Sequence, residues 1–351
     1  MSRPLAIAAV CYPDLGGSGV VAAELARGLA ARGHRLTLLA TSAPARLRGD
    51  AGGVRFEAID VPSSPVFPHA PYDVAVAGHL VALCQREPID VIHLHYAVPH
   101  AASAVLARAV LGAALPATVV TLHGTDVTRL GAHPSLRAVT AAAIARCDGV
   151  TAPSVALRDD AVRGLGLAAD AIEVIANFVD LARFAPPARR DRVGGGLAGL
   201  FPPGADGPIL IHVSNLRPIK RPVDVVEVLA RVRRALPARA VVIGDGPERA
   251  AVEARARALG VADAVCLLGR RDDFAALLGH ADGFVLPSET EGFGLAALEA
   301  MAAGVPVFGY RVGALPEVVT ADAGALVALA DLDALAAAIV AALGALAQRA
   351  A

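Results

Sequence analysis

The sequence predicts an α/β protein made of two doubly wound, Rossmann-like domains that face a cleft. Short apolar segments alternate with helical segments along both halves of the 351-residue chain. This alternation favours parallel sheets covered by helices on both faces. The length fits two domains of ordinary size. Residues 185–208, rich in Pro, Gly and Arg, are interpreted as a surface connection near the start of the second domain.

In the first half, strands are predicted at residues 5–10, 35–40, 90–95, 117–122, 149–152 and 172–175. Helices are predicted at residues 20–32, 101–115 and 134–147. Gly33 follows the first helix directly, as a left-handed cap does. We place the domain boundary after residue 178, which gives domains of residues 1–178 and 179–351.

In the second half, strands are predicted at residues 209–213, 240–243, 264–268, 283–286 and 305–308. Helices are predicted at residues 222–236, 248–259, 272–280 and 294–303. Doubly wound sheets bind ligands beyond the carboxyl ends of their strands, so the loops that follow the strands are the first places to look for a site.

Composition excludes several classes of function. The formal net charge is −1, from 32 basic and 33 acidic residues, which argues against a nucleic-acid partner. The apolar run at residues 334–348 is rich in alanine and too short to span a bilayer, so no stable membrane insertion is expected. The four cysteines are scattered and the N-terminus lacks signal-peptide features, which together predict a cytoplasmic protein.

A glycine-rich loop connects the first strand to the first helix. Gly16, Gly17 and Ser18 lie in it, and glycines there let the backbone approach an anion at the helix N-terminus. Two alternatives stay open, a structural turn and a dinucleotide fingerprint. The fingerprint is disfavoured because the second strand ends in Thr41 and Ser42, without a carboxylate for a ribose.

A second candidate begins at the strand end near Ser288 and continues into a helix. Glu291 lies in its loop and Glu299 lies inside the helix. The helix N-terminus, at Phe293, Gly294 and Leu295, offers backbone N–H groups to a diphosphate. The alternative is that Glu291 caps the helix and Glu299 is solvated, but Glu299 stands among apolar residues, where an unpaired carboxylate is costly.

The third candidate is the loop at residues 214–221, again between a strand and a helix. Arg217 and Lys220 could bind a diphosphate there, and Lys220 is the one lysine of the chain. A solvated basic loop is the alternative.

The fourth candidate groups Tyr96, Thr121 and His123, which follow two strands of the first half. Nearby histidines raise the question of a metal. Because no HExxH motif or carboxylate cluster accompanies them, we expect no metal site. We interpret His93, His95 and His100 as structural.

Together these motifs resemble the retaining family 4 glycosyltransferases, which have the GT-B fold. The E-x7-E motif of Glu291 and Glu299, the Lys220 loop and Gly244-Asp245-Gly246-Pro247 carry the resemblance across the second half. In the first half, the segments at residues 11–20, 92–101 and 121–128 resemble the N-acetyl-α-D-glucosaminyl L-malate synthases of bacillithiol biosynthesis. This resemblance implies UDP-N-acetylglucosamine as the donor, L-malate as the acceptor, retention of the α configuration and no cofactor or metal.

The resemblance also implies a role for each candidate. The first domain would bind the acceptor and the second the nucleotide sugar. Lys220, Gly16, Gly17 and the backbone of residues 293–295 would hold the diphosphate, with Arg217 beside them. Glu291 would bind the donor sugar, Glu299 the ribose, and His123 the sugar 6-hydroxyl. The residues expected to hold malate are Ser18, Tyr96, Thr121 and Asn215.

Three other functions stay open: a related transferase with an inositol phosphate, lipid or polysaccharide acceptor, a UDP-sugar epimerase, and a non-catalytic UDP-sugar-binding protein. Relatives usually continue with a C-terminal helix that crosses back to the first domain, and this sequence stops at Ala351 before one is evident. The sequence leaves a homo-oligomer open.

Overall fold

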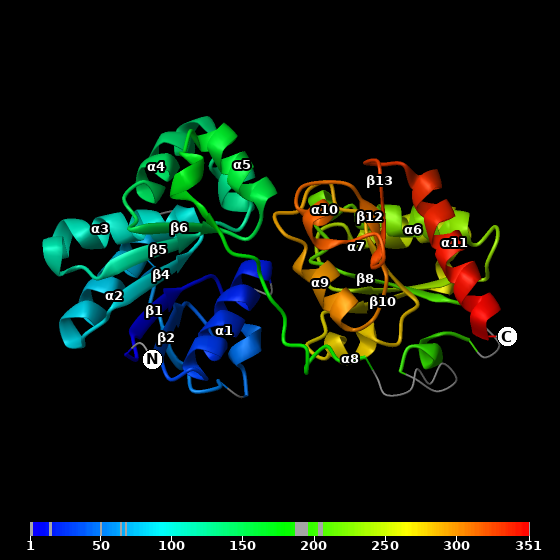
Figure 1. The fold of residues 1–351 in the computed structure, drawn as a ribbon, viewed down its shortest axis with the longest axis horizontal. Coiled ribbons are helices and arrows are strands. Elements are labelled where there is room, and N and C mark those ends of the chain that lie inside the picture. Colours follow the sequence, from blue (N-terminus) through cyan, green and yellow to red (C-terminus); the bar gives the residue numbers. More distant parts are fainter. Residues whose placement is uncertain are drawn as a thin grey trace. The chain divides into compact units, whose positions relative to one another are not determined.

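The computed structural model describes residues 3–13, 16–49, 51–63, 65–66, 69–186, 196–202 and 206–350. The chain divides into two compact units, Met1–Asn177 (unit 1) and Phe178–Ala351 (unit 2), shown in Figure 1. This division lies one residue before the predicted domain boundary.

Unit 1 is a seven-stranded sheet in the order β3-β2-β1-β4-β5-β6-β7, with every neighbouring pair parallel. Its strands are β1 (Ala6–Val10), β2 (Arg35–Ala40), β3 (Arg55–Ala58), β4 (Val91–His95), β5 (Ala117–Thr121), β6 (Gly149–Ala152) and β7 (Glu173–Val174). Its α-helices are α1 (Gly17–Ala30), α2 (Tyr72–Arg86), α3 (Ala102–Leu111), α4 (Pro134–Ile144) and α5 (Val155–Leu165). A π-helical turn, Ala97–Ala101, precedes α3.

Both faces of this sheet are covered, because successive residues of a strand point to opposite faces. On β1, Ala8 and Val10 join the core formed with α2 to α5, whereas Ile7 joins the core formed with α1. The predicted parallel, doubly covered sheet is therefore confirmed.

Unit 2 repeats the arrangement with six parallel strands in the order β10-β9-β8-β11-β12-β13. The strands are β8 (Ile209–Val213), β9 (Arg239–Ile243), β10 (Val265–Gly269), β11 (Gly283–Leu286), β12 (Val307–Tyr310) and β13 (Gly324–Val327). The helices are α6 (Pro222–Val232), α7 (Arg249–Ala258), α8 (Phe274–Leu278), α9 (Leu295–Ala302), α10 (Leu315–Val318) and α11 (Leu332–Ala350). One face packs on α6, α7 and α11, and the other on α8, α9 and α10; Figure 1 shows α11, in red, beside α6.

Several predicted details were wrong. Helix α1 begins at Gly17, three residues before its predicted start, because the glycine loop itself enters the helix. The segment 185–208 is not wholly a surface connection. Residues 187–195 and 203–205 of it lie outside the described residues, but Leu197 and Phe201 are buried in the core of unit 2. The Arg239 guanidinium lies 4.9 Å from the centre of the Phe201 ring, which adds to this anchoring.

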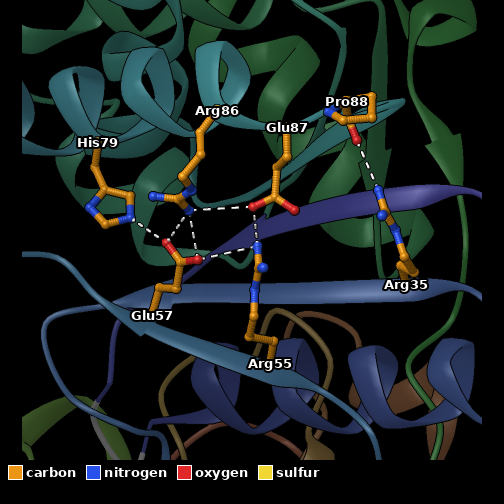
Figure 2. A network of polar contacts seen from close by, with 7 residues as sticks. All are labelled: Arg35, Arg55, Glu57, His79, Arg86, Glu87 and Pro88. Atoms are coloured by element: carbon orange, nitrogen blue, oxygen red, sulfur yellow. Dashed lines mark hydrogen bonds and ion pairs between the residues drawn. The ribbon is translucent and has the colours of Figure 1, made fainter.

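A network of charges ties strand β3 to the end of α2 (Figure 2). Arg86 donates hydrogen bonds of 2.7 and 2.9 Å to the two oxygens of Glu57, and His79 lies 3.2 Å from the same carboxylate. Arg55 pairs with Glu87, which follows α2. Burial raises the pKa of Glu57, but hydrogen bonds from Arg86 and His79 outweigh it, so that the pKa is lowered overall. The network therefore links β3 to the end of α2 through ion pairs.

Among the described residues, the stretch Ala97–Ala114, with a mean hydropathy of 1.3, is long and apolar enough to cross a membrane by length and composition. Its residues Ala101, Ala104 and Ala107 are buried in the core of unit 1. These residues form one face of the helix, whereas Leu106 and Val110 are exposed.

Candidate active site

Most candidate residues of each unit lie beside the point where the strand order reverses. In unit 1 this point lies between β1 and β4, and in unit 2 between β8 and β11. The loops that follow these strands diverge to opposite faces of the sheet and leave a crevice for ligands. The glycine loop follows β1, the Lys220 loop follows β8, and the Glu291 loop follows β11.

In unit 2, Lys220 and Glu291 meet although they are 71 positions apart. Lys220 Nζ donates a 2.6 Å hydrogen bond to Glu291 Oε1, and the Ser288 hydroxyl donates one of 2.7 Å to the same oxygen. Ser288 is fully buried. Since both bonds end on Oε1, Glu291 Oε2 is the carboxylate oxygen without a partner among the described residues.

Backbone contacts fix the position of Glu291. Its carbonyl oxygen accepts a hydrogen bond from the Ala314 N–H at 2.9 Å. A Cβ atom on Gly313 would lie 2.2 Å from that same carbonyl oxygen, so this position requires glycine, and its φ of +48° is one that glycine adopts freely. The N–H of Glu289 also donates to the Ile219 carbonyl at 2.8 Å, which joins the Glu291 loop to the Lys220 loop.

Helix α9 begins directly after the Glu291 loop. Its N-cap residue, Gly294, has a φ of +94°, and no side chain caps the helix. The N–H groups of Ala297 and Leu298 donate to the Gly294 carbonyl oxygen, so those of Leu295 and Ala296 are the ones left to solvent or to an anion. Glu299, the fifth residue of α9, is 5% exposed. The structure thus brings Lys220, Glu291 and the α9 N-terminus together, whereas the side chain of Arg217 is exposed.

A buried histidine supports the start of the Lys220 loop. His212 Nδ1 lies 2.8 Å from the Val285 carbonyl oxygen and Nε2 lies 2.8 Å from Ser214 Oγ, which accepts from the Leu216 N–H. The carbonyl requires Nδ1 to carry the proton, so Ser214 donates to Nε2. Burial lowers the pKa of His212 to about 4, which keeps the ring neutral in this role.

The Lys220 loop also contains a strained residue. Arg221 has a φ of +45°, which is uncommon for a residue with a side chain. Its Nε donates a 2.7 Å hydrogen bond to Asp224 Oδ2, and the buried Tyr310 hydroxyl donates one of 2.7 Å to the same oxygen.

Asn215, before Lys220, is packed against the Gly246 backbone.

In unit 1, Gly16 is the N-cap of α1, and neither a side-chain cap nor an acidic residue occupies the first turn. Ser18 is 5% exposed. Tyr96 follows β4 with a φ of +92°, and its ring meets that of Tyr12, from the loop after β1, edge to face with centroids 5.7 Å apart. The loops after β1 and β4 are therefore in contact through these two rings.

Thr121 ends β5, His123 follows it, and both belong to a polar cluster. Thr121 Oγ1 lies 2.7 Å from both His93 Nε2 and Thr151 Oγ1, which leaves its hydroxyl one further hydrogen bond. His123 is half-buried, and its Nε2 lies 3.0 Å from His95 Nδ1. Burial, together with His93 and His100, lowers the pKa of His123 to about 3, so the ring is neutral.

Asp126 organises the backbone around His123. It is fully buried, and its carboxylate accepts hydrogen bonds from the N–H groups of His123, Gly124 and Ala97 at 2.9–3.0 Å. The loops after β4 and β5 are thereby held together.

Comparison with known proteins identifies the family. A model described as Glycosyltransferase Family 4 matches residues 15–183, and one described as Glycosyl transferases group 1 matches residues 202–345. The N-acetyl-alpha-D-glucosaminyl L-malate synthase of Bacillus anthracis is 39% identical to the chain over 328 residues, which cover 93% of this chain and 84% of that protein. The chain is a family 4 glycosyltransferase. The family resemblance drawn from the motifs is thus confirmed.

Solved structures show the same fold for this family 4 glycosyltransferase. The Anabaena protein HepE, in complex with UDP and glucose, superposes with a TM-score of 0.78 at 21% identity, over 96% of this chain and 89% of that one. WaaG, a glycosyltransferase involved in lipopolysaccharide biosynthesis, superposes with a TM-score of 0.74 at 19% identity, over 96% of this chain and 90% of that one. The GT-B fold predicted from the sequence is confirmed.

Sequence reasoning missed several residues that build the site of this glycosyltransferase. Asp126 accepts a hydrogen bond from the backbone of the candidate His123. His212 contacts Ser214 at the start of the Lys220 loop, and Tyr310 donates to Asp224, the partner of Arg221. A histidine inside an otherwise apolar strand, as His212 is in β8, was the signal available for one of them. Tyr310 and Asp224 are 86 positions apart, and only the tertiary structure pairs them.

Proposed function

We propose that this family 4 glycosyltransferase transfers N-acetylglucosamine from UDP-N-acetylglucosamine to L-malate, with retention of the α configuration and without a metal. The observation that carries the proposal is the arrangement of Lys220, Glu291 and the uncapped N-terminus of α9 around one point of unit 2. The choice of donor and acceptor is supported by the malate synthase relative, which is 39% identical over nearly the whole chain.

The chemistry of unit 2 suits a nucleotide diphosphate. The diphosphate would be neutralised by the cationic side chains of Lys220 and Arg217. It would also accept hydrogen bonds from the backbone N–H groups of residues 293–295. Glu291 would accept hydrogen bonds from sugar hydroxyls through Oε2, the oxygen that Lys220 and Ser288 leave unoccupied. Glu299 would accept from the ribose hydroxyls.

In unit 1, Gly16 and Gly17 would allow the diphosphate to approach the start of α1, where a Cβ on Gly17 would meet no atom within 4 Å. The residues proposed to hold the malate acceptor are Ser18, Tyr96, Thr121 and Asn215. His123 would hydrogen-bond to the 6-hydroxyl of the donor sugar.

The proposed reaction needs no protein nucleophile. The malate hydroxyl oxygen forms a bond to the anomeric carbon on the face that the diphosphate leaves, while the bond from that carbon to the phosphate oxygen breaks. The malate proton passes to the departing phosphate oxygen, and UDP leaves with its developing charge stabilised by Lys220 and the α9 N-terminus. A covalent route would need a second carboxylate at the sugar, and Glu299 is assigned to the ribose.

A cytoplasmic location is part of the proposal. Within the described part of the chain, Cys84, Cys147 and Cys266 form no disulfide, as is usual in a reducing compartment.

The test is UDP release from UDP-N-acetylglucosamine with and without L-malate, with EDTA in both reactions. We expect release that depends on malate, and a product whose anomeric proton shows the small coupling of an α-glycoside. UDP release without malate would contradict the assigned acceptor. Conversion of the donor sugar without an acceptor would indicate an epimerase, and UDP binding without turnover would indicate a binding protein. Activity that EDTA abolishes would contradict metal independence.

A further inference from the structure

His95 is a buried histidine that contacts the candidate residue His123 directly. It ends β4, is 1% exposed, and stacks on His93 with ring centroids 4.4 Å apart. Its Nδ1 lies 3.0 Å from His123 Nε2. Its other nitrogen, Nε2, is buried and has no hydrogen-bond partner within the described part of the chain.

The surroundings hold the His95 backbone in place. His100 Nδ1 contacts the His95 carbonyl oxygen, so this nitrogen of His100 carries the proton. The other nitrogen, His100 Nε2, then accepts from the Tyr72 hydroxyl, 3.0 Å away. His95 is therefore fixed by a chain of hydrogen bonds that leads away from His123.

The unpartnered nitrogen decides which ring donates between His95 and His123. Burial lowers the pKa values of both, so both rings are neutral and each carries one proton. If His123 donated from Nε2, the proton of His95 would lie on its own Nε2, as a buried N–H without an acceptor, which is rare and costly. If His95 donates from Nδ1, its Nε2 holds only a lone pair. This arrangement has the lower free energy because no buried N–H is left without an acceptor.

We propose that His95 is a positioning residue that holds His123 in the Nδ1–H tautomer. In this state His123 Nε2 accepts from His95, and Nδ1 is the nitrogen left for a ligand, as a donor. This inference rests on the proposed function: His123 donates its Nδ1–H to a hydroxyl oxygen of the donor sugar. With both ring nitrogens committed, His123 cannot serve as a general base.

The tautomer can be read directly in the full chain without any substrate. Nitrogen-15 histidine labelling and long-range proton–nitrogen correlation spectra distinguish an Nδ1–H from an Nε2–H imidazole, and His123→Gln assigns the resonances by their loss. We expect the Nδ1–H pattern for His123, although free imidazole side chains prefer Nε2–H.

A matched pair of variants separates positioning from packing. Asparagine and leucine have similar sizes, but only asparagine places an amide N–H near the position of His95 Nδ1. We expect His95→Leu to lose the Nδ1–H pattern at His123 and to lower kcat/KM by about tenfold, the effect of one lost hydrogen bond. His95→Asn should keep the pattern and stay within about threefold of the original activity.

Two results would overturn the proposal. One is an Nε2–H pattern at His123 in the unaltered chain. The other is an equal loss of the Nδ1–H pattern and of kcat/KM in His95→Leu and His95→Asn, since a packing defect would affect both variants alike. An unaltered chain without transferase activity whose His123 shows the Nδ1–H pattern would overturn the proposed function and still support the tautomer.

Discussion

Lys220 and Glu291 form an ion pair of 2.6 Å at the switch point of unit 2, with the Lys220 side chain 22% and the Glu291 side chain 9% exposed. The chain's one lysine is thus engaged by the carboxylate that lies beside the N-terminus of α9. A diphosphate that binds there must compete with Glu291 for the same ammonium group.

The first prediction follows from this competition. Glu291→Gln keeps the shape of the side chain and releases Lys220, so UDP should bind about two- to tenfold more tightly, because a charge-assisted hydrogen bond no longer opposes it. The same variant should transfer sugar with a kcat/KM lower by about 10- to 100-fold, since the sugar loses a charged acceptor.

Calorimetric titration with UDP and initial rates measure these two effects. The matched control is Glu289→Gln, the same change of charge at an exposed residue of the same loop. If Glu291→Gln and Glu289→Gln bind UDP equally well, the ion pair does not compete with the ligand.

A second prediction concerns the glycine that supports Glu291. Gly313→Ala would place a Cβ atom 2.2 Å from the Glu291 carbonyl oxygen, so the Glu291 loop must move. We expect UDP affinity and transfer to fall together, each by at least about tenfold, because displacements near 1 Å can cost that much.

Gly260 supplies the comparison for backbone strain alone. Its φ of +67° is as unusual for alanine as the φ of Gly313, yet a Cβ atom on Gly260 would meet nothing within 4 Å. Gly260→Ala should cost about 1 kcal/mol of stability and leave UDP binding unchanged. Equal effects of the two substitutions on UDP binding would exclude displacement of Glu291 as the cause.

A third prediction concerns the support of Arg221. Tyr310→Phe removes the buried hydroxyl that donates to Asp224 and should lower the free energy of unfolding of unit 2 by about 1 kcal/mol. Asp224→Ala should cost about 2–3 kcal/mol, because it leaves the buried Tyr310 hydroxyl and Arg221 without their acceptor. Differential scanning calorimetry of the full chain measures both, with Asp224→Asn as the variant that keeps an acceptor. A Tyr310→Phe chain as stable as the original would show that the hydroxyl bond contributes nothing.

A fourth prediction concerns pH. The pKa of His212 is about 4 in the folded chain, and an unfolded histidine has a pKa of about 6.5. Below pH ~6.5 the unfolded chain therefore binds a proton at His212 that the folded chain does not bind. The contribution of His212 to the free energy of unfolding is fully present above this pH and is lost as the pH falls towards 4. The contribution of one histidine is at most about 1.4 kcal/mol per pH unit.

Urea unfolding between pH 7 and 4.5 tests this expectation. His212→Gln should reduce the slope of stability against pH by up to that amount, whereas a substitution at the exposed His133 serves as the comparison. An unchanged slope in His212→Gln would mean that the ring accepts a proton in the folded state.

The sequence was sufficient for the fold because most strands are apolar segments bounded by loops. The ranges of β2, β6, β8 and β11 match their predictions residue for residue. Strand β3 was missed because its residues are exposed or only partly buried, which removes the apolar signal. The π-helical turn at Ala97–Ala101 was also missed, because local propensity does not predict it.

For the site, the sequence predicted which loops matter but not how their side chains pair. Lys220 and Glu291 were each identified from their loops, and both follow strands that border the switch point. Their hydrogen bond, and that of His95 with His123, depends on the register of strands far apart in the sequence. Such pairings are decided by tertiary packing, so no local pattern reports them.

The apolar interior of the molecule is divided between unit 1 and unit 2. Each of the four core clusters among the described residues lies wholly within one unit. Substitutions that repack the interior of unit 1 therefore need no compensating change inside unit 2. An enzyme built this way is modular: one half can be exchanged for that of another family 4 glycosyltransferase while each interior stays intact.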